Sequence, residues 1–73
     1  MTEKRLELMA NNFIRLMDDL RWGFASENVE LLETADQKIR SNHDSGLLTV
    51  DQYIALRNTA HVYMKILKEG GPK

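Results

Sequence analysis

The segment from Thr49 to Glu69 carries apolar residues on nearly two sides of a helix, and this feature most constrains how the chain can fold. One seam consists of Tyr53, Leu56, Ala60, Tyr63, Met64 and Leu67. A second seam consists of Ala55, Thr59, Val62 and Ile66. At about 100° per residue the seams merge into an apolar arc of about 200°, and a surface helix needs little more than half of that. The surplus therefore requires cover from the rest of the chain, from a second copy or from another protein.

Amphipathic patterns of helical period account for almost the whole chain and predict an all-α fold. They place helices at about residues 2–22, 27–41 and 49–69, in a single helical domain over residues 1–69 with a disordered tail at 70–73. The apolar stripe of the first helix consists of Leu6, Met9, Ala10, Phe13, Leu16, Met17, Leu20 and Phe24. The stripe of the second consists of Val29, Leu32, Ala35 and Ile39. We expect a small three-helix bundle in which the third helix packs centrally against the other two.

Capping residues indicate where the helices begin. Thr2 and Ser26 are suitable N-caps for the first and second helices. Thr49 and Gln52 form the sequence of a capping box, in which each side chain bonds the backbone amide of the other residue. The turn-forming stretch at residues 41–46, which ends in a glycine, predicts a loop before this box.

Gly23 leaves two architectures open, because glycine inside a helix costs only about 1 kcal/mol relative to alanine. A turn at residues 23–26 gives the three-helix bundle. A mere kink gives a bent helical hairpin, which could dimerise into a four-helix bundle. The same choice decides the position of Trp22. We expect it to fold back over the core within the turn, whereas a continuous helix would leave it exposed, where Trp beside Arg is typical of an interface hot spot.

Composition limits the possible functions. The chain has 73 residues, of which 42% are hydrophobic, 29% are charged and none is cysteine, so one small core forms without disulfides or thiolate chemistry. The net charge of −1 and the absence of a basic patch disfavour nucleic-acid binding. No apolar run has membrane-spanning length and no signal peptide is visible, so we expect a cytoplasmic protein that has no membrane contact.

Motifs for metal binding and catalysis fail at the residues that matter. The loop at 41–52 has the glycine of a calcium-binding loop, but its ligand positions lack the required carboxylates. His43 and His61 have no second ligand at helical spacing. Asp18 and Asp19 point about 100° apart on a helix and cannot share a site. We therefore expect no enzyme activity, no metal and no cofactor.

We expect a non-catalytic interaction module, such as an adaptor, regulator, inhibitor or co-chaperone, that presents an apolar helix face to a protein partner or to a second copy. The candidate partner-binding residues are Val62, Ile66, Ala55 and Thr59 on the second seam, together with Trp22. The sequence leaves the partner and the oligomeric state open.

Two other functions remain possible. A dimeric, nucleic-acid-associated transcriptional regulator could gather Lys4, Arg5, Arg15 and Arg21 from two chains into one surface. The helices at 27–41 and 49–69 do not favour it, because the connection between them is longer than the turn of a DNA-reading helix-turn-helix. A structural subunit of a larger assembly is the third possibility, and it would be unfolded or insoluble alone.

Overall fold

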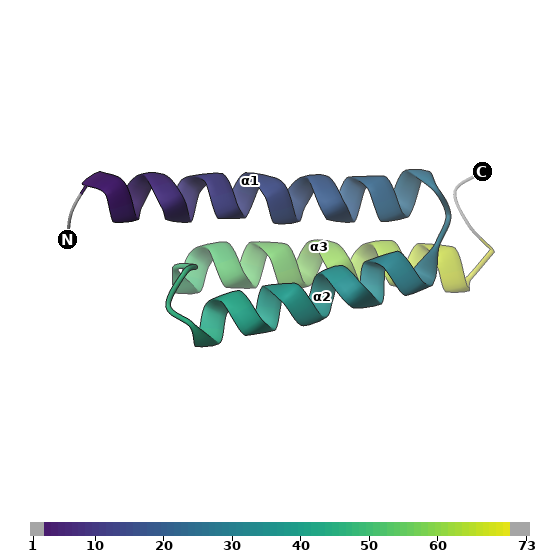
Figure 1. Cartoon of the computed structure of the whole chain (residues 1–73). Coiled ribbons are helices and arrows are strands. Elements are labelled where there is room, and N and C mark those ends of the chain that lie inside the picture. The colour runs from purple at the N-terminus through teal and green to yellow at the C-terminus, as the bar shows by residue number, and fades with distance from the viewer. Residues whose placement is uncertain (1–2, 71–73) are drawn as a thin grey trace.

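The computed structural model describes residues 3–70, which form three α-helices and no strand (Figure 1). These are α1 (Glu3–Ala25), α2 (Val29–Asp44) and α3 (Val50–Lys68). The chain reverses after α1 and again after α2, so α1 and α3 run in the same direction and α2 runs opposite to both (Figure 1). The all-α three-helix bundle is thereby confirmed, and the bent helical hairpin is excluded.

Gly23 lies inside α1 and brings α1 close to α2. The helix continues through it to Ala25, three residues beyond the expected end. A Cβ added at Gly23 would lie 3.0 Å from Cδ2 of Leu32, which is fully buried. The reversal comes later, at residues 26–28, where Glu27 adopts a positive φ of 52°. Glycine is therefore needed at position 23 for close helix packing and not for the turn.

The cap of α2 is Asn28, and the expectation that Ser26 caps this helix is wrong. The Asn28 side-chain oxygen accepts hydrogen bonds from the backbone amides of Glu30 at 3.0 Å and Leu31 at 3.3 Å. Ser26 instead continues the last turn of α1, since its backbone amide donates to the Trp22 carbonyl. As a result α2 begins two residues later than expected, and it ends at Asp44, three residues later.

We expect Asn28→Ala to lower the free energy of unfolding by about 1 kcal/mol, because two amides at the start of α2 lose their acceptor. Ser26→Ala is the matched control and should change it by less than about 0.5 kcal/mol. Urea denaturation followed by circular dichroism measures both values. Equal effects of the two substitutions would contradict the assignment of the cap.

The capping box at the start of α3 is confirmed. The Gln52 amide donates to the Thr49 hydroxyl and the Thr49 amide donates to the Gln52 side chain, both at 3.0 Å. At the other end α3 stops at Lys68, one residue before the expected end, and Gly70 lies in the turn that follows. The expected N-cap Thr2 and residues 71–73 of the expected disordered tail lie outside the described residues.

The core lies on the axis of the bundle. Its buried apolar residues are Met9, Leu16, Leu20, Leu32, Ala35, Ile39, Leu48, Leu56 and Ala60. The expectation that α3 is central is wrong: α2 contacts both neighbours more extensively than α1 and α3 contact each other. The expectation that Leu6 and Ala10 are core residues is also wrong, since both are exposed. The first turns of α1 project beyond the connection between α2 and α3 (Figure 1), and Leu6, in the second turn of this helix, is 54% exposed.

Candidate protein-binding face

The two seams of α3 have different environments. On the first seam Leu56 and Ala60 are fully buried against the other helices. On the second seam Val62 is 54% exposed and Ala55 is exposed, while Thr59 and Ile66 are half-buried. The described part of the chain therefore covers only part of the apolar surplus of α3.

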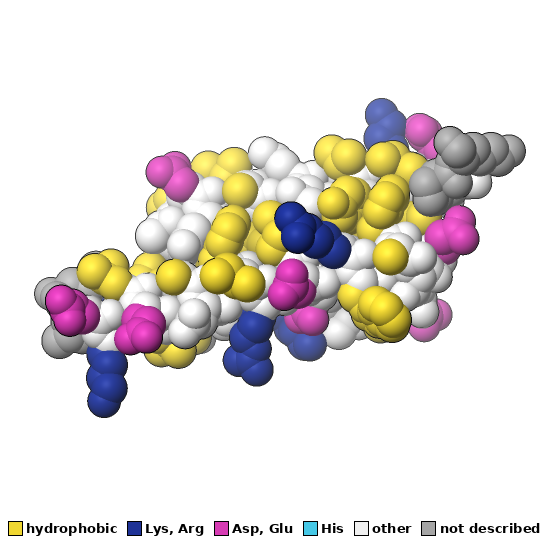
Figure 2. Space-filling view, turned by 90° about the horizontal axis from the view of Figure 1, so that it is seen from above, with side chains coloured by type: hydrophobic (Ala, Val, Ile, Leu, Met, Phe, Trp, Pro, Cys, Tyr) yellow, Lys and Arg dark blue, Asp and Glu magenta, His cyan; other side chains and the backbone are white. Residues whose placement is uncertain are grey.

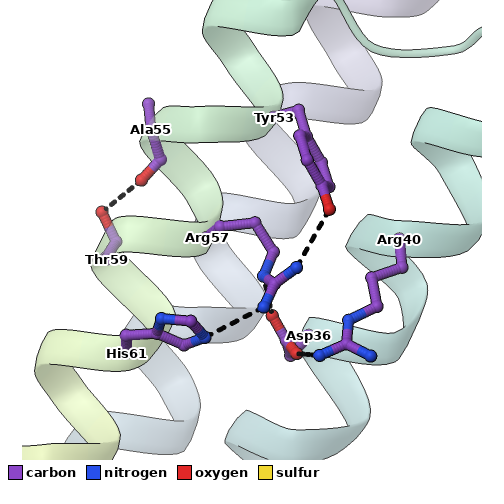
Figure 3. Close-up of polar contacts among 7 residues, drawn as sticks. All are labelled: Asp36, Arg40, Tyr53, Ala55, Arg57, Thr59 and His61. Atoms are coloured by element: carbon purple, nitrogen blue, oxygen red, sulfur yellow. Dashed lines mark hydrogen bonds and ion pairs between the residues drawn. The ribbon is translucent and has the colours of Figure 1, made fainter.

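Thr59 adds little polarity to the second seam. Its hydroxyl donates to the Ala55 carbonyl at 2.9 Å, inside its own helix. Figure 3 shows this pair on the side of α3 opposite to Arg57. Because the hydroxyl already has an acceptor, burial of Thr59 by a partner would leave no unpaired polar group there.

Apolar residues of α1 extend the second seam into a wider face. The rings of Phe24 and Tyr63 stack with centroids 4.3 Å apart, which sets α1 beside α3 on this side of the bundle. Figure 2 shows apolar side chains along both helices. We call this surface the α1–α3 face and define it by seven residues that helix geometry places on the same side of the two helices: Ala10, Ile14 and Met17 of α1, and Ala55, Thr59, Val62 and Ile66 of α3.

Ile14 is the member of the α1–α3 face that the sequence did not single out. It is 56% exposed and lies on the flank of the apolar stripe of α1, beside the half-buried Met17. The available signal was a β-branched apolar residue at the edge of the stripe, four residues after Ala10 and three before Met17.

Trp22 belongs to another surface, and the expectation that it folds back over the core is wrong. Because α1 continues to Ala25, Trp22 stays on the outside of the helix with 68% of its surface exposed. It lines a small hollow between α1 and α2 together with Leu31 and Lys38. The structure therefore separates Trp22 from Val62 and Ile66, with which the sequence grouped it as a partner-binding residue.

A polar cluster that the sequence did not reveal joins α2 to α3 (Figure 3). Asp36 is buried, and its Oδ1 lies 2.8 Å from Nε of Arg57. This contact is an ion pair without hydrogen-bond alignment, since neither atom has a hydrogen-bond partner among the described residues. The second carboxylate oxygen lies 3.3 Å from Arg40. The pair places opposite charges between two helices in a largely water-excluded position.

The two terminal nitrogens of Arg57 are also engaged. Nη1 donates to the Tyr53 hydroxyl at 2.9 Å, and Nη2 lies 3.0 Å from Nε2 of His61. The second histidine, His43, stacks on the Tyr53 ring with centroids 4.0 Å apart. All of these groups are held by neighbours within the bundle, so the cluster is arranged to join helices. Within residues 3–70, no group of three His, Cys, Asp or Glu residues is arranged to hold a metal ion.

The cations proposed for nucleic-acid contact are spread around α1. Arg5 donates to the Gly46 carbonyl at 3.2 Å, toward the connection between α2 and α3. Lys4 and Arg15 lie near each other in angle on the helix, whereas Arg21 lies about 120° from Arg15. One chain therefore does not gather them on a single surface.

No helix in the described part of the chain is long and apolar enough to cross a membrane. Comparisons of the chain with protein-family models, with curated proteins and with solved structures find no match.

Proposed function

We propose that this protein is a non-catalytic interaction module that binds a protein surface through its α1–α3 face. The observation that supports this proposal is the second seam of α3, where Ala55 and Val62 stay exposed and Thr59 and Ile66 are only half-buried although α1 and α2 pack against the same helix. A core of this size rarely supplies more than about 3–5 kcal/mol, so burial against a partner would add stability that a small chain needs. An apolar strip on the outside, next to exposed apolar residues of a neighbouring helix, is typical of a binding surface.

The mechanism is burial of the strip against an apolar helix or groove of the partner. Val62 and Ile66 are the anchors: burial of a fully exposed side chain of this size contributes roughly 1.5–3 kcal/mol, and each of these two gains the share that belongs to its still exposed part. A few such contacts suffice for a micromolar complex. Ala55 and Thr59 are small and permit close approach of the partner backbone. Trp22 and Leu31 lie on the α1–α2 side and take no part in this contact.

Site-specific photo-crosslinking in living cells tests the proposal. A photoreactive amino acid replaces Val62 on the α1–α3 face, and in a control protein it replaces Leu8, an apolar residue of α1 that is 52% exposed and lies about 120° from Ile14 on the helix. We expect a discrete covalent adduct from position 62 and none from position 8.

The adduct is identified by mass spectrometry and challenged with Ile66→Asp, which should remove it. An adduct with any protein, this chain included, supports the proposed face. Equal labelling from both positions, or labelling that persists after Ile66→Asp, would contradict it.

A further inference from the structure

We infer that the occupant of the α1–α3 face is a second copy of this chain, packed across a twofold axis near Ile14 so that the two α1 helices run antiparallel. This inference rests on the proposed function, because it assigns a partner to the same face. The inference is carried by charges that flank the exposed apolar residue of α1 and by an uncovered leucine at the projecting end of that helix.

Glu7, Ile14 and Arg21 are spaced by seven residues, which is about two helical turns, so they form a row along one side of α1. All three are exposed, and neither Glu7 nor Arg21 forms an ion pair with another described residue. The row carries an acid at one end, an apolar residue in the middle and a base at the other end. It is therefore complementary to itself when it is reversed.

A twofold axis through the middle of this row reverses it. Glu7 and Arg21 each lie about 10 Å along the helix from Ile14, on opposite sides. In an antiparallel pair each Glu7 would therefore lie opposite the Arg21 of the other copy, while the two Ile14 side chains meet at the axis. A parallel pair would instead set like charges opposite each other, which costs free energy.

The same arrangement covers Leu6 and Val62. Leu6 lies on the core stripe of α1, yet it is 54% exposed because the first turns of that helix project beyond the connection between α2 and α3 (Figure 1). The stacking of Phe24 on Tyr63 sets Val62 at about the height of Gly23, which is nine residues after Ile14. Leu6 is eight residues before Ile14. Reversal about Ile14 therefore brings Leu6 of one copy to the height of Val62 of the other.

A single cysteine tests the axis directly, because the chain has no cysteine of its own. In the variant Ile14→Cys the new thiol would lie next to its own symmetry mate, within the short Cα separation that a disulfide requires. We expect this variant to form a disulfide-linked dimer under mild oxidation at micromolar concentration. Leu8→Cys is the matched control, and it should stay unlinked under the same conditions.

Charge reversal tests the antiparallel pairing without cysteine. Sedimentation equilibrium over a hundredfold concentration range gives the dissociation constant of the dimer. Arg21→Glu should raise this constant about tenfold, because like charges then lie opposite each other at both ends of the row. The double variant Glu7→Arg with Arg21→Glu should restore it to within about threefold of the wild-type value, since the pairing is rebuilt with its sign reversed.

Thermal melts of every variant check that the fold is intact, which we expect because the altered side chains are all exposed. A wild-type chain that stays monomeric throughout the range overturns the inference, as does a dimer that is indifferent to Arg21→Glu. A dimer that the double variant fails to restore also overturns it. If crosslinking from Val62 captures a different protein while the chain is monomeric, the proposed function stands and the second copy is rejected as its partner.

Discussion

Replacing Asp36 by alanine is expected to lower the free energy of unfolding by about 3 kcal/mol, because it leaves the Arg57 guanidinium without its counter-ion between α2 and α3. The side chain of Arg57 is 21% exposed, so solvent relieves only part of this loss. Its contacts with Tyr53 and His61 remain, but neither supplies a negative charge. Guanidinium chloride denaturation of the two proteins measures the difference.

Two further variants separate the buried pair from an ordinary surface pair. Asp19→Ala removes a more exposed ion pair, in which Oδ2 of Asp19 lies 3.9 Å from Nζ of Lys38. This substitution should change the free energy of unfolding by less than about 1 kcal/mol. The double variant Asp36→Leu with Arg57→Leu removes both charges and should recover most of the stability, since no unpaired charge stays buried. A double variant no more stable than Asp36→Ala would show that packing around the cluster matters more than charge.

The helices that the sequence predicted best are those whose ends are set by local chemistry. The capping box of Thr49 and Gln52 depends on residues three apart, so it can be recognised without knowledge of the rest of the fold. The start of α2 was misplaced because Ser26 and Asn28 are both good caps. Only the length of α1, which runs on through Gly23, selects Asn28. Within that length Gly23 packs against Leu32 of another helix, a contact that the local sequence does not reveal.

In the candidate site and the polar cluster, too, the features that depend on one helix alone could be predicted, and those that depend on contacts between helices could not. The second seam of α3 was visible as surplus apolar surface, because periodicity alone reveals it. Asp36 lies four residues after Leu32 and three before Ile39, on the buried stripe of α2. A buried carboxylate at this position predicts a basic partner. Identifying that partner as Arg57 requires knowledge of how the residues of α2 and α3 align with each other. The exposure of Trp22 could not be predicted either, because it depends on the continuation of α1 to Ala25.

Leu32→Ala is expected to lower the free energy of unfolding by about 3 kcal/mol, since Leu32 is fully buried and its removal leaves a cavity between α1 and α2. The measurement is urea denaturation followed by circular dichroism, with Leu8→Ala as the control. Leu8 is the same residue type and is about half exposed, so its truncation should cost less than about 1 kcal/mol. Equal losses from the two leucines would contradict the assignment of the core.

The cavity should also reverse the effect of an added methyl group at Gly23. In the wild-type chain Gly23→Ala forces its Cβ to within 3.0 Å of Leu32, and the overpacking outweighs the higher helix propensity of alanine, so stability falls by about 1 kcal/mol. In the Leu32→Ala background the two nearest atoms, Cδ2 and Cγ of Leu32, are gone and the Cβ of Leu31 remains at 3.3 Å, so the same substitution should no longer lower stability and should raise it by up to about 1 kcal/mol. The double-mutant cycle then gives a coupling energy of about 1–2 kcal/mol. Additive effects would mean that α1 and α2 do not approach each other at Gly23. The placement of the reversal at residues 26–28, between α1 and α2, would then be wrong as well.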